Sequence, residues 1–86
     1  MTPEAASYLH KARRCLTFAR INLDVQLGND ASRNAYLAAF HAAQALIFER
    51  TGKAAKSHRG VHAAFSRVAT EEPQMPTDIR RFLAQA

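Results

Sequence analysis

The chain has 86 residues, and its 12 Lys and Arg outnumber its 7 Asp and Glu to give a net charge of +5. This length predicts a single domain over residues 1–86 with a thin core, because so short a chain buries only roughly 60% of its surface on folding. The one cysteine excludes an internal disulfide framework and a thiolate zinc cluster. Neither a membrane-spanning run nor a signal peptide is visible, so we expect a cytoplasmic protein without membrane contact.

The first predicted helix opens at Thr2-Pro3-Glu4, a capping threonine followed by proline and an acidic residue. It is predicted to run to Leu27 and to end at Gly28-Asn29, because glycine and asparagine favour the left-handed backbone conformation that closes many helices. Its main apolar stripe comprises Ala5, Tyr8, Leu9, Ala12, Cys15, Leu16, Ala19, Leu23 and Leu27. A second stripe on nearly the opposite side holds Phe18, Ile21 and Val25. Because a solvated helix needs only one stripe, the second predicts an interface, and we expect a homodimer.

The second predicted helix begins with Asp30 or Ser32 as its cap, continues to Thr51 and ends at Gly52. It is alanine-rich and apolar almost all the way round, which is typical of a buried helix at the centre of a bundle.

Three polar side chains of this helix are candidate ligand-binding residues, because polar groups on a buried helix need partners. Arg33 reaches solvent, pairs with a carboxylate or binds a phosphate, and its first-turn charge favours an anionic partner. Tyr36 belongs mainly to the core, with its hydroxyl available to a neighbouring helix or a ligand. His41 has apolar neighbours, a setting more typical of a satisfied core histidine than of a catalyst.

A basic segment surrounds the start of the third predicted helix, which Ser57 caps and whose apolar positions are Val61, Ala64, Phe65 and Val68. The candidate residues of this segment are Lys53, Lys56, Ser57, His58, Arg59 and His62. Cations beside the amides of a helix start predict a phosphate site, and Gly60 would let a ligand approach. A solvated basic turn explains the same pattern. Two histidines alone make a poor metal site, so we expect neither metal nor cofactor.

Residues 71–76 are predicted as a loop, and Thr77 is predicted to cap a last helix that reaches Ala86 without a stop signal. Further helical sequence is therefore expected after this point. The predicted fold class is all-α, an up-and-down helical bundle of three long helices and the start of a fourth.

Two blocks of sequence resemble the small prokaryotic HEPN domain. The first is Ser32-Arg33-Asn34-Ala35-Tyr36 with Ala38, Phe40-His41-Ala42-Ala43 and Ala45-Leu46; the second is Lys56-Ser57-His58-Arg59-Gly60-Val61 with Phe65. The resemblance covers roughly residues 5–70 and includes Tyr8-Leu9, Lys11-Ala12, Leu16 and Ala19 of the first helix. It implies a helical bundle that dimerises and that is often paired with a minimal nucleotidyltransferase as a toxin–antitoxin system.

The same resemblance implies one of two activities. Many HEPN proteins are metal-independent ribonucleases with an Arg-x(4–6)-His motif near a dimer cleft, and others bind nucleotides or RNA without catalysis. Here seven residues separate Arg33 from His41 and Arg50 from His58, and two separate Arg59 from His62. The motif is therefore missing, and the enzymatic status is open. For RNA cleavage the local candidates are His58, Arg59 and His62, with histidine as the base and arginine stabilising the transition state.

We therefore expect a domain that binds RNA or a nucleotide phosphate through Arg33, Tyr36, His41, Lys53, Lys56, Ser57, His58 and Arg59. Its expected partners are a second copy of the chain and a nucleotidyltransferase. The alternative is a non-catalytic helical adaptor or dimerisation module that docks an acidic protein. Salt separates the two readings, because neutralisation of phosphates makes affinity fall steeply with salt and a packed protein interface does not.

Overall fold

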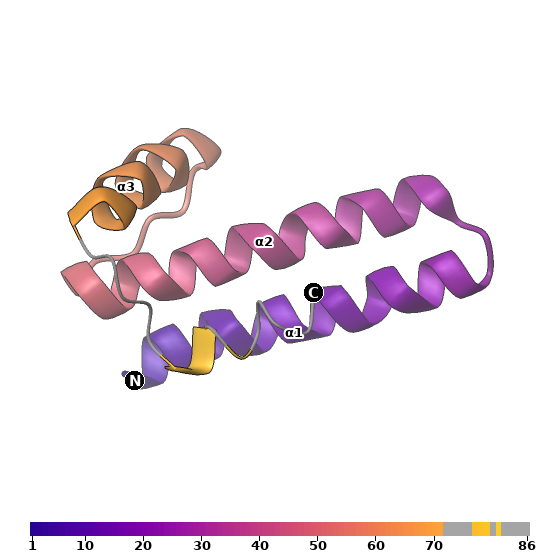
Figure 1. Cartoon of the computed structure of the whole chain (residues 1–86), viewed down its shortest axis with the longest axis horizontal. Coiled ribbons are helices and arrows are strands. Elements are labelled where there is room, and N and C mark those ends of the chain that lie inside the picture. Colours follow the sequence, from indigo (N-terminus) through magenta and orange to yellow (C-terminus); the bar gives the residue numbers. More distant parts are fainter. Residues whose placement is uncertain (72–76, 80, 82–86) are drawn as a thin grey trace.

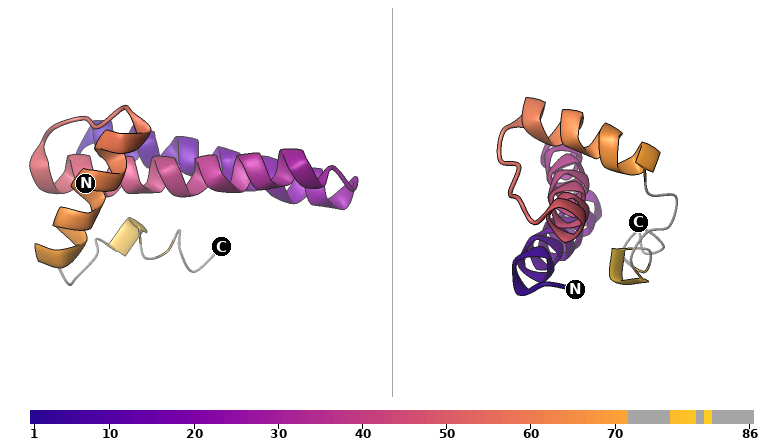
Figure 2. Two further views of the ribbon diagram at one scale, coloured as in Figure 1. Left: turned by 90° about the horizontal axis from the view of Figure 1, so that it is seen from above. Right: turned by 90° about the vertical axis from the view of Figure 1, so that its left-hand side faces the viewer.

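The computed structural model describes residues 1–71, 77–79 and 81, and they form an all-α bundle as predicted. Its long helices are α1 (Pro3–Asp24), α2 (Gly28–Thr51) and α3 (His58–Glu71), and residues 77–79 and 81 are also helical. Helices α1 and α2 form an antiparallel hairpin (Figure 1). Helix α3 lies across this hairpin at the end where α1 begins and α2 ends (Figure 2). The remaining residues of the predicted loop and last helix lie outside the described residues.

The start of α1 follows the prediction. The Thr2 hydroxyl accepts a hydrogen bond from the Ala5 amide at 3.2 Å, and proline occupies the first turn. The Thr2 amide donates to Glu49 Oε1 at 3.0 Å, and the N-terminal ammonium lies 3.9 Å from the other oxygen of that carboxylate. The start of α1 is therefore held against the last turns of α2.

The predicted end of α1 is wrong by three residues, because α1 stops at Asp24 and not at Leu27. The left-handed residue is Gln26, with φ 63°, rather than Gly28 or Asn29. The Gln26 amide donates to the Leu23 carbonyl at 3.0 Å and the Leu27 amide to the Asn22 carbonyl at 2.7 Å. This pair of bonds is the usual closure around a left-handed residue.

The predicted caps of α2, Asp30 and Ser32, are also wrong, since both lie inside a helix that begins at Gly28. The Leu27 carbonyl already accepts the Ala31 amide at 2.9 Å, so the chain is helical before either residue is reached. Across the hairpin the Asn34 side-chain amide donates to Asn22 Oδ1 at 2.8 Å. This contact holds the two helices together beside the short connection 25–27.

Helix α2 is the central helix of the bundle, as its composition predicts. Its small side chains let α1 approach on one side and α3 on another. The larger core cluster joins α1 to α2, α3 and residue 79, and contains Leu9, Ala12, Ala38, Ala42, Ala45, Leu46, Val68 and Ile79. A second cluster joins α2 to α3 and contains Phe40, Ile47, Val61 and Ala64. All four predicted apolar positions of α3 take part in these two clusters, with Phe65 partly buried against both.

The end of the hairpin farthest from α3 exposes large apolar side chains, which we call the apolar end. They are Phe18, Ile21, Leu23, Val25 and Leu27, and each is 46% exposed or more. The predicted second stripe is therefore on the surface. Leu23 and Leu27, which the sequence assigns to the main stripe, are exposed as well, because α3 covers only the other end. A shallow hollow at the apolar end is lined by Leu16, Ala19, Arg20, Leu23, Ala31, Ser32 and Ala35.

Membrane crossing requires a long apolar helix, and none of the described helices has that character.

Gly28, the first residue of α2, and Gly52, which follows its last residue, differ in backbone conformation. This difference predicts opposite effects of alanine substitution on the free energy of unfolding. Gly52 has φ 70° and its amide donates to the Phe48 carbonyl at 2.8 Å, so it closes α2 in the left-handed region. We expect Gly52→Ala to lower the free energy of unfolding by about 1 kcal/mol. Gly28→Ala is the control, because Gly28 is helical with nothing within 4 Å of an added Cβ, and alanine is the better helix former. Urea unfolding followed by circular dichroism measures both; equal effects would contradict this assignment.

Candidate functional site

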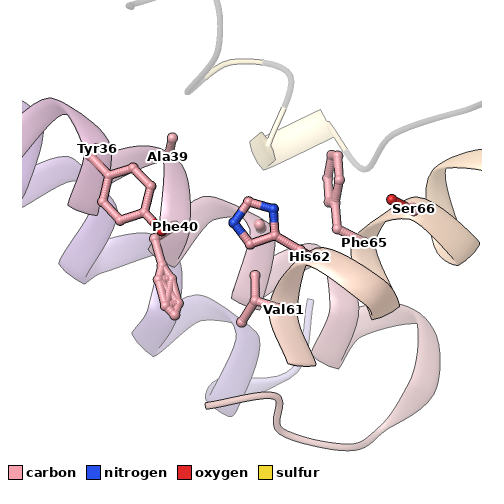
Figure 3. A pocket seen from close by; sticks show the side chains of 8 residues that line it. Tyr36, Ala39, Phe40, Val61, His62, Phe65 and Ser66 are labelled. Atoms are coloured by element: carbon pink, nitrogen blue, oxygen red, sulfur yellow. The ribbon is translucent and has the colours of Figure 1, made fainter. Parts of the chain in front are cut away.

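A hollow of about 170 Å³ lies between α2 and α3, and we call it the junction pocket. It is lined by Tyr36, Ala39, Phe40, Ala43, Val61, His62, Phe65 and Ser66. Tyr36 and Phe40 project from α2 on one side, and His62 and Phe65 project from α3 on the other (Figure 3). The lining is mainly apolar and aromatic, with the Tyr36 hydroxyl, the His62 ring and the Ser66 hydroxyl as its polar groups.

The spacing of these residues explains why they meet. Positions 36, 39, 40 and 43 recur at helical intervals, so they share one face of α2, and positions 61, 62, 65 and 66 share one face of α3. Phe40 and Val61 are buried where the two faces touch. The neighbouring α2 positions 39 and 43 are alanines, whose short side chains leave space between the helices.

A tyrosine–histidine pair closes one end of the junction. The Tyr36 hydroxyl and His58 Nδ1 share a hydrogen bond of 2.7 Å across 22 residues of sequence. The two rings are stacked with centroids 5.7 Å apart, and the His58 ring also lies 4.7 Å from the ring of Phe40. The pair therefore fixes the first residue of α3 to the middle of α2, and it sets the position of the Tyr36 ring.

A second polar connection runs through the buried side chain of Gln44. His41 Nδ1 donates to Gln44 Oε1 at 2.7 Å, and Gln44 Nε2 donates to the Ala55 carbonyl at 2.8 Å. The carbonyl can only accept, so the amide orientation places the proton of His41 on Nδ1 and leaves Nε2 with the lone pair in the neutral ring. The His41 ring also lies parallel to Phe40, with centroids 5.8 Å apart. Gln44 thus anchors the segment 52–57, which carries Lys53 and Lys56.

The predicted cations are exposed around this junction. Lys53 and Lys56 lie on either side of Ala55 in the anchored segment, and Arg59 lies in the first turn of α3 beside His58. Arg33 lies one turn before Tyr36 in α2, which places it near the same face of that helix. We call these four exposed cations the basic rim; they neighbour the Tyr36–His58 pair and the Ala55 anchor along the chain.

Ser57 caps α3 as predicted, and its hydroxyl accepts the Gly60 amide at 3.0 Å. A Cβ added to Gly60 would lie 2.9 Å from that hydroxyl oxygen. The close approach that Gly60 permits is therefore used by the cap of its own helix.

The structure brings some of the candidate residues together and separates others. Tyr36, His41 and His58 meet in one cluster of rings around Phe40, whereas His62 points into the junction pocket. His58 and His62 therefore have different neighbours. No group of three or more histidine, cysteine, aspartate or glutamate side chains within the described ranges could hold a metal. The assignment of ligand binding to these residues stays a prediction.

Sequence analysis missed the residues that connect the cluster. The sequence places Phe65 among the apolar positions of the third predicted helix, and it indicates no role in a site for Phe40 or Gln44. A signal for Gln44 exists: it is a polar residue in an alanine-rich helix, three positions after His41, where a side chain can reach the histidine. Phe65 carries no such signal, because its place in the pocket depends on how α3 crosses α2.

Comparison with known proteins gives one match. The profile described as HEPN domain matches residues 5–86 of the chain. Neither the curated proteins nor the solved structures contain a match. The profile therefore covers α1 from Ala5 onward, α2, α3 and the junction pocket between α2 and α3.

The buried amide of Gln44 gives a prediction about the basic segment. We expect Gln44→Met to lower the free energy of unfolding by about 1–3 kcal/mol, because the Ala55 carbonyl and His41 Nδ1 lose their partner. Amide hydrogen exchange in segment 52–57 should become faster than in the wild-type protein, and it should change more there than in the core of α2. Gln26→Met is the control, since Gln26 is exposed in the hairpin turn. Unchanged exchange in 52–57 would contradict the anchoring role.

Proposed function

Because this chain belongs to the HEPN domain family, we propose that it binds RNA or a nucleotide phosphate at the junction of α2 and α3. The observation that carries the proposal is the hydrogen bond of 2.7 Å between the Tyr36 hydroxyl and His58 Nδ1. This bond joins Tyr36, an aromatic wall of the junction pocket, to the basic start of α3. Stacking surfaces beside positive charge are the two features that single-stranded nucleic acid requires.

The charge distribution supports a polyanionic ligand. The chain carries a net charge of +5, and Arg33, Lys53, Lys56 and Arg59 are all exposed, with Lys56 and Arg59 close to His58 in the sequence. The start of α3 adds the positive end of a helix dipole. A phosphate at this rim therefore meets several cations at once, and Ser57 and His58 supply polar groups at the same helix start.

The proposed activity is binding rather than cleavage. No Arg–His pair of the sequence has the four to six intervening residues of the family's nuclease motif. In addition, His58 Nδ1 is hydrogen-bonded to the Tyr36 hydroxyl, so only Nε2 of that ring is left to face a ribose hydroxyl. His62 and Arg59 alone provide an acid–base group and a cation without the motif's spacing.

In this proposal the protein is one half of a toxin–antitoxin pair with a nucleotidyltransferase, and it acts as a homodimer. The apolar end supports a second copy, because Phe18, Ile21 and Val25 form a stripe of large exposed side chains away from the α1–α2 core. A contiguous surface of this kind is typical of interfaces. Purification of the chain in complex with a nucleotidyltransferase from its own cell tests the partner.

The basic rim predicts a strong salt dependence of RNA binding. For a short single-stranded RNA, the slope of log affinity against log salt is about −0.7 for each phosphate neutralised. We expect the triple variant Lys53→Ala, Lys56→Ala, Arg59→Ala to reduce the magnitude of this slope by about 2. Fluorescence anisotropy of a labelled oligonucleotide at several salt concentrations measures it.

A matched control removes the same charge elsewhere. The variant Lys11→Ala, Arg13→Ala, Arg67→Ala changes exposed cations of α1 and of the second half of α3. This control should lower the affinity for RNA less than the first triple variant does, and the slope of log affinity against log salt should stay as in the wild type. Equal losses in both triple variants would indicate an effect of net charge alone. Unchanged binding in the first variant would contradict the proposed site and favour the adaptor that docks an acidic protein.

The apolar end gives a prediction about assembly. Wild-type protein should sediment as a dimer at micromolar concentration, and Ile21→Glu should sediment as a monomer, because a carboxylate would be desolvated at the interface. Ser7→Glu, an exposed position in the first turns of α1, is the control and should remain dimeric. A monomeric wild-type protein would refute the dimer.

A further inference from the structure

We infer that the junction pocket is a subsite for one unpaired nucleobase of single-stranded RNA. The inference rests on the proposed function and makes it more specific, because it names the part of the ligand that enters the pocket. It assigns the phosphates to the basic rim and the base to the space between α2 and α3. A free phosphate or a continuous RNA duplex would leave this pocket unused.

The size of the pocket matches a single ring system. Its volume is about 170 Å³, and an apolar cavity of about 150 Å³ holds one benzene-sized molecule. Pockets for larger organic ligands usually begin at about 300 Å³. Because the pocket is open on one side, a base can enter edge first while its ribose stays outside.

The walls of the pocket suit a flat aromatic guest. Tyr36 and Phe40 stand on the α2 side and Phe65 on the α3 side (Figure 3). Every base presents a π-face, so stacking on these rings is favourable for any sequence. The alanines at positions 39 and 43 keep the space between the rings open.

The Tyr36 wall is held in place before a ligand arrives. Its hydroxyl is bonded to His58 at 2.7 Å, and the His58 ring packs against Phe40. The Phe40 ring in turn lies parallel to His41, which Gln44 holds through a 2.7 Å hydrogen bond. A stacking surface that is already fixed loses little conformational entropy on binding.

His62 supplies a hydrogen-bonding group at the pocket. Its ring lines the space and points into it between the two helices (Figure 3). A neutral imidazole offers one donor and one acceptor, so it can meet either kind of group on the edge of a base. Arg59 lies three positions earlier, in the same row of α3, so a cation lies one turn from His62 on the basic rim. A base in the pocket therefore has its own phosphate near positive charge.

The test compares two RNAs with equal phosphate content. One is an oligouridylate of eight nucleotides, and the other is its abasic analogue with the same number of phosphates. Wild-type protein should bind the oligouridylate about tenfold more tightly than the abasic chain, the scale of one stacked base. The variant Ala39→Leu fills the pocket and leaves every cation in place, so this preference should disappear while abasic RNA binds as before. Ala63→Leu, at an exposed position of α3 outside the pocket, is the matched control and should keep the preference.

A second measurement uses uridine, a nucleoside without phosphate, and tests binding of the base alone. Uridine, added at millimolar concentration, should shift the NMR signals of Tyr36, His62 and Phe65 in the wild type and not in Ala39→Leu. Equal affinity for the two RNAs, with no shifts from uridine, overturns the base subsite and leaves phosphate binding intact. Shifts from uridine without binding of either RNA support the subsite and refute the proposed RNA-binding function. If neither RNA binds and uridine causes no NMR shifts, both the base subsite and the RNA-binding function are refuted.

Discussion

The structure depends on satisfying the polar atoms of a helix that is buried on most of its sides. Gln44 is 6% exposed, and it is the polar side chain that is buried most deeply within the described part of the chain. Its amide has a partner at each end, His41 Nδ1 at the oxygen and the Ala55 carbonyl at the nitrogen. Every buried side-chain nitrogen or oxygen of the described residues likewise has a partner. Since an unpartnered buried amide would cost about 1–3 kcal/mol, this arrangement fixes where the segment after α2 must run.

That segment is basic, and its position decides where charge meets aromatic surface. The anchored carbonyl of Ala55 lies between Lys53 and Lys56, and α3 begins directly afterwards at His58. The bond from His58 to Tyr36 then brings the start of α3 onto the middle of α2. The hydrogen bonds of buried Gln44 and of the exposed Tyr36–His58 pair therefore hold the basic segment and the start of α3 against α2, which also lines the junction pocket. The proposed site needs both the basic segment and the junction pocket.

The two ends of the α1–α2 hairpin have different surfaces, and α3 is the cause. Where α3 lies across the hairpin, Phe40 and Val61 are buried, and Lys53, Lys56 and Arg59 of the adjoining segment are exposed. At the apolar end no third helix of the described residues covers the α1–α2 pair, and Ile21 and Leu23 remain 50% and 63% exposed. An interface with another chain at that end would leave the junction pocket free, so assembly and ligand binding can occur on separate surfaces.

The sequence by itself determined the number and kind of helices, the central place of α2 and the caps at Thr2 and Ser57, because periodicity and capping are local properties. It also identified Tyr36 and His41 as polar residues of the second helix and His58 as a candidate of the basic segment, but its assignment of Tyr36 mainly to the core is wrong, because the side chain is 45% exposed. Only the tertiary structure decided which partners they have. The meeting of Tyr36 with His58 spans 22 residues and depends on how α3 crosses α2. Likewise, the turn closed at Gln26 rather than Gly28 because the packing of α1 on α2, with Asn34 bonded to Asn22, outweighed the conformational preference of a single glycine.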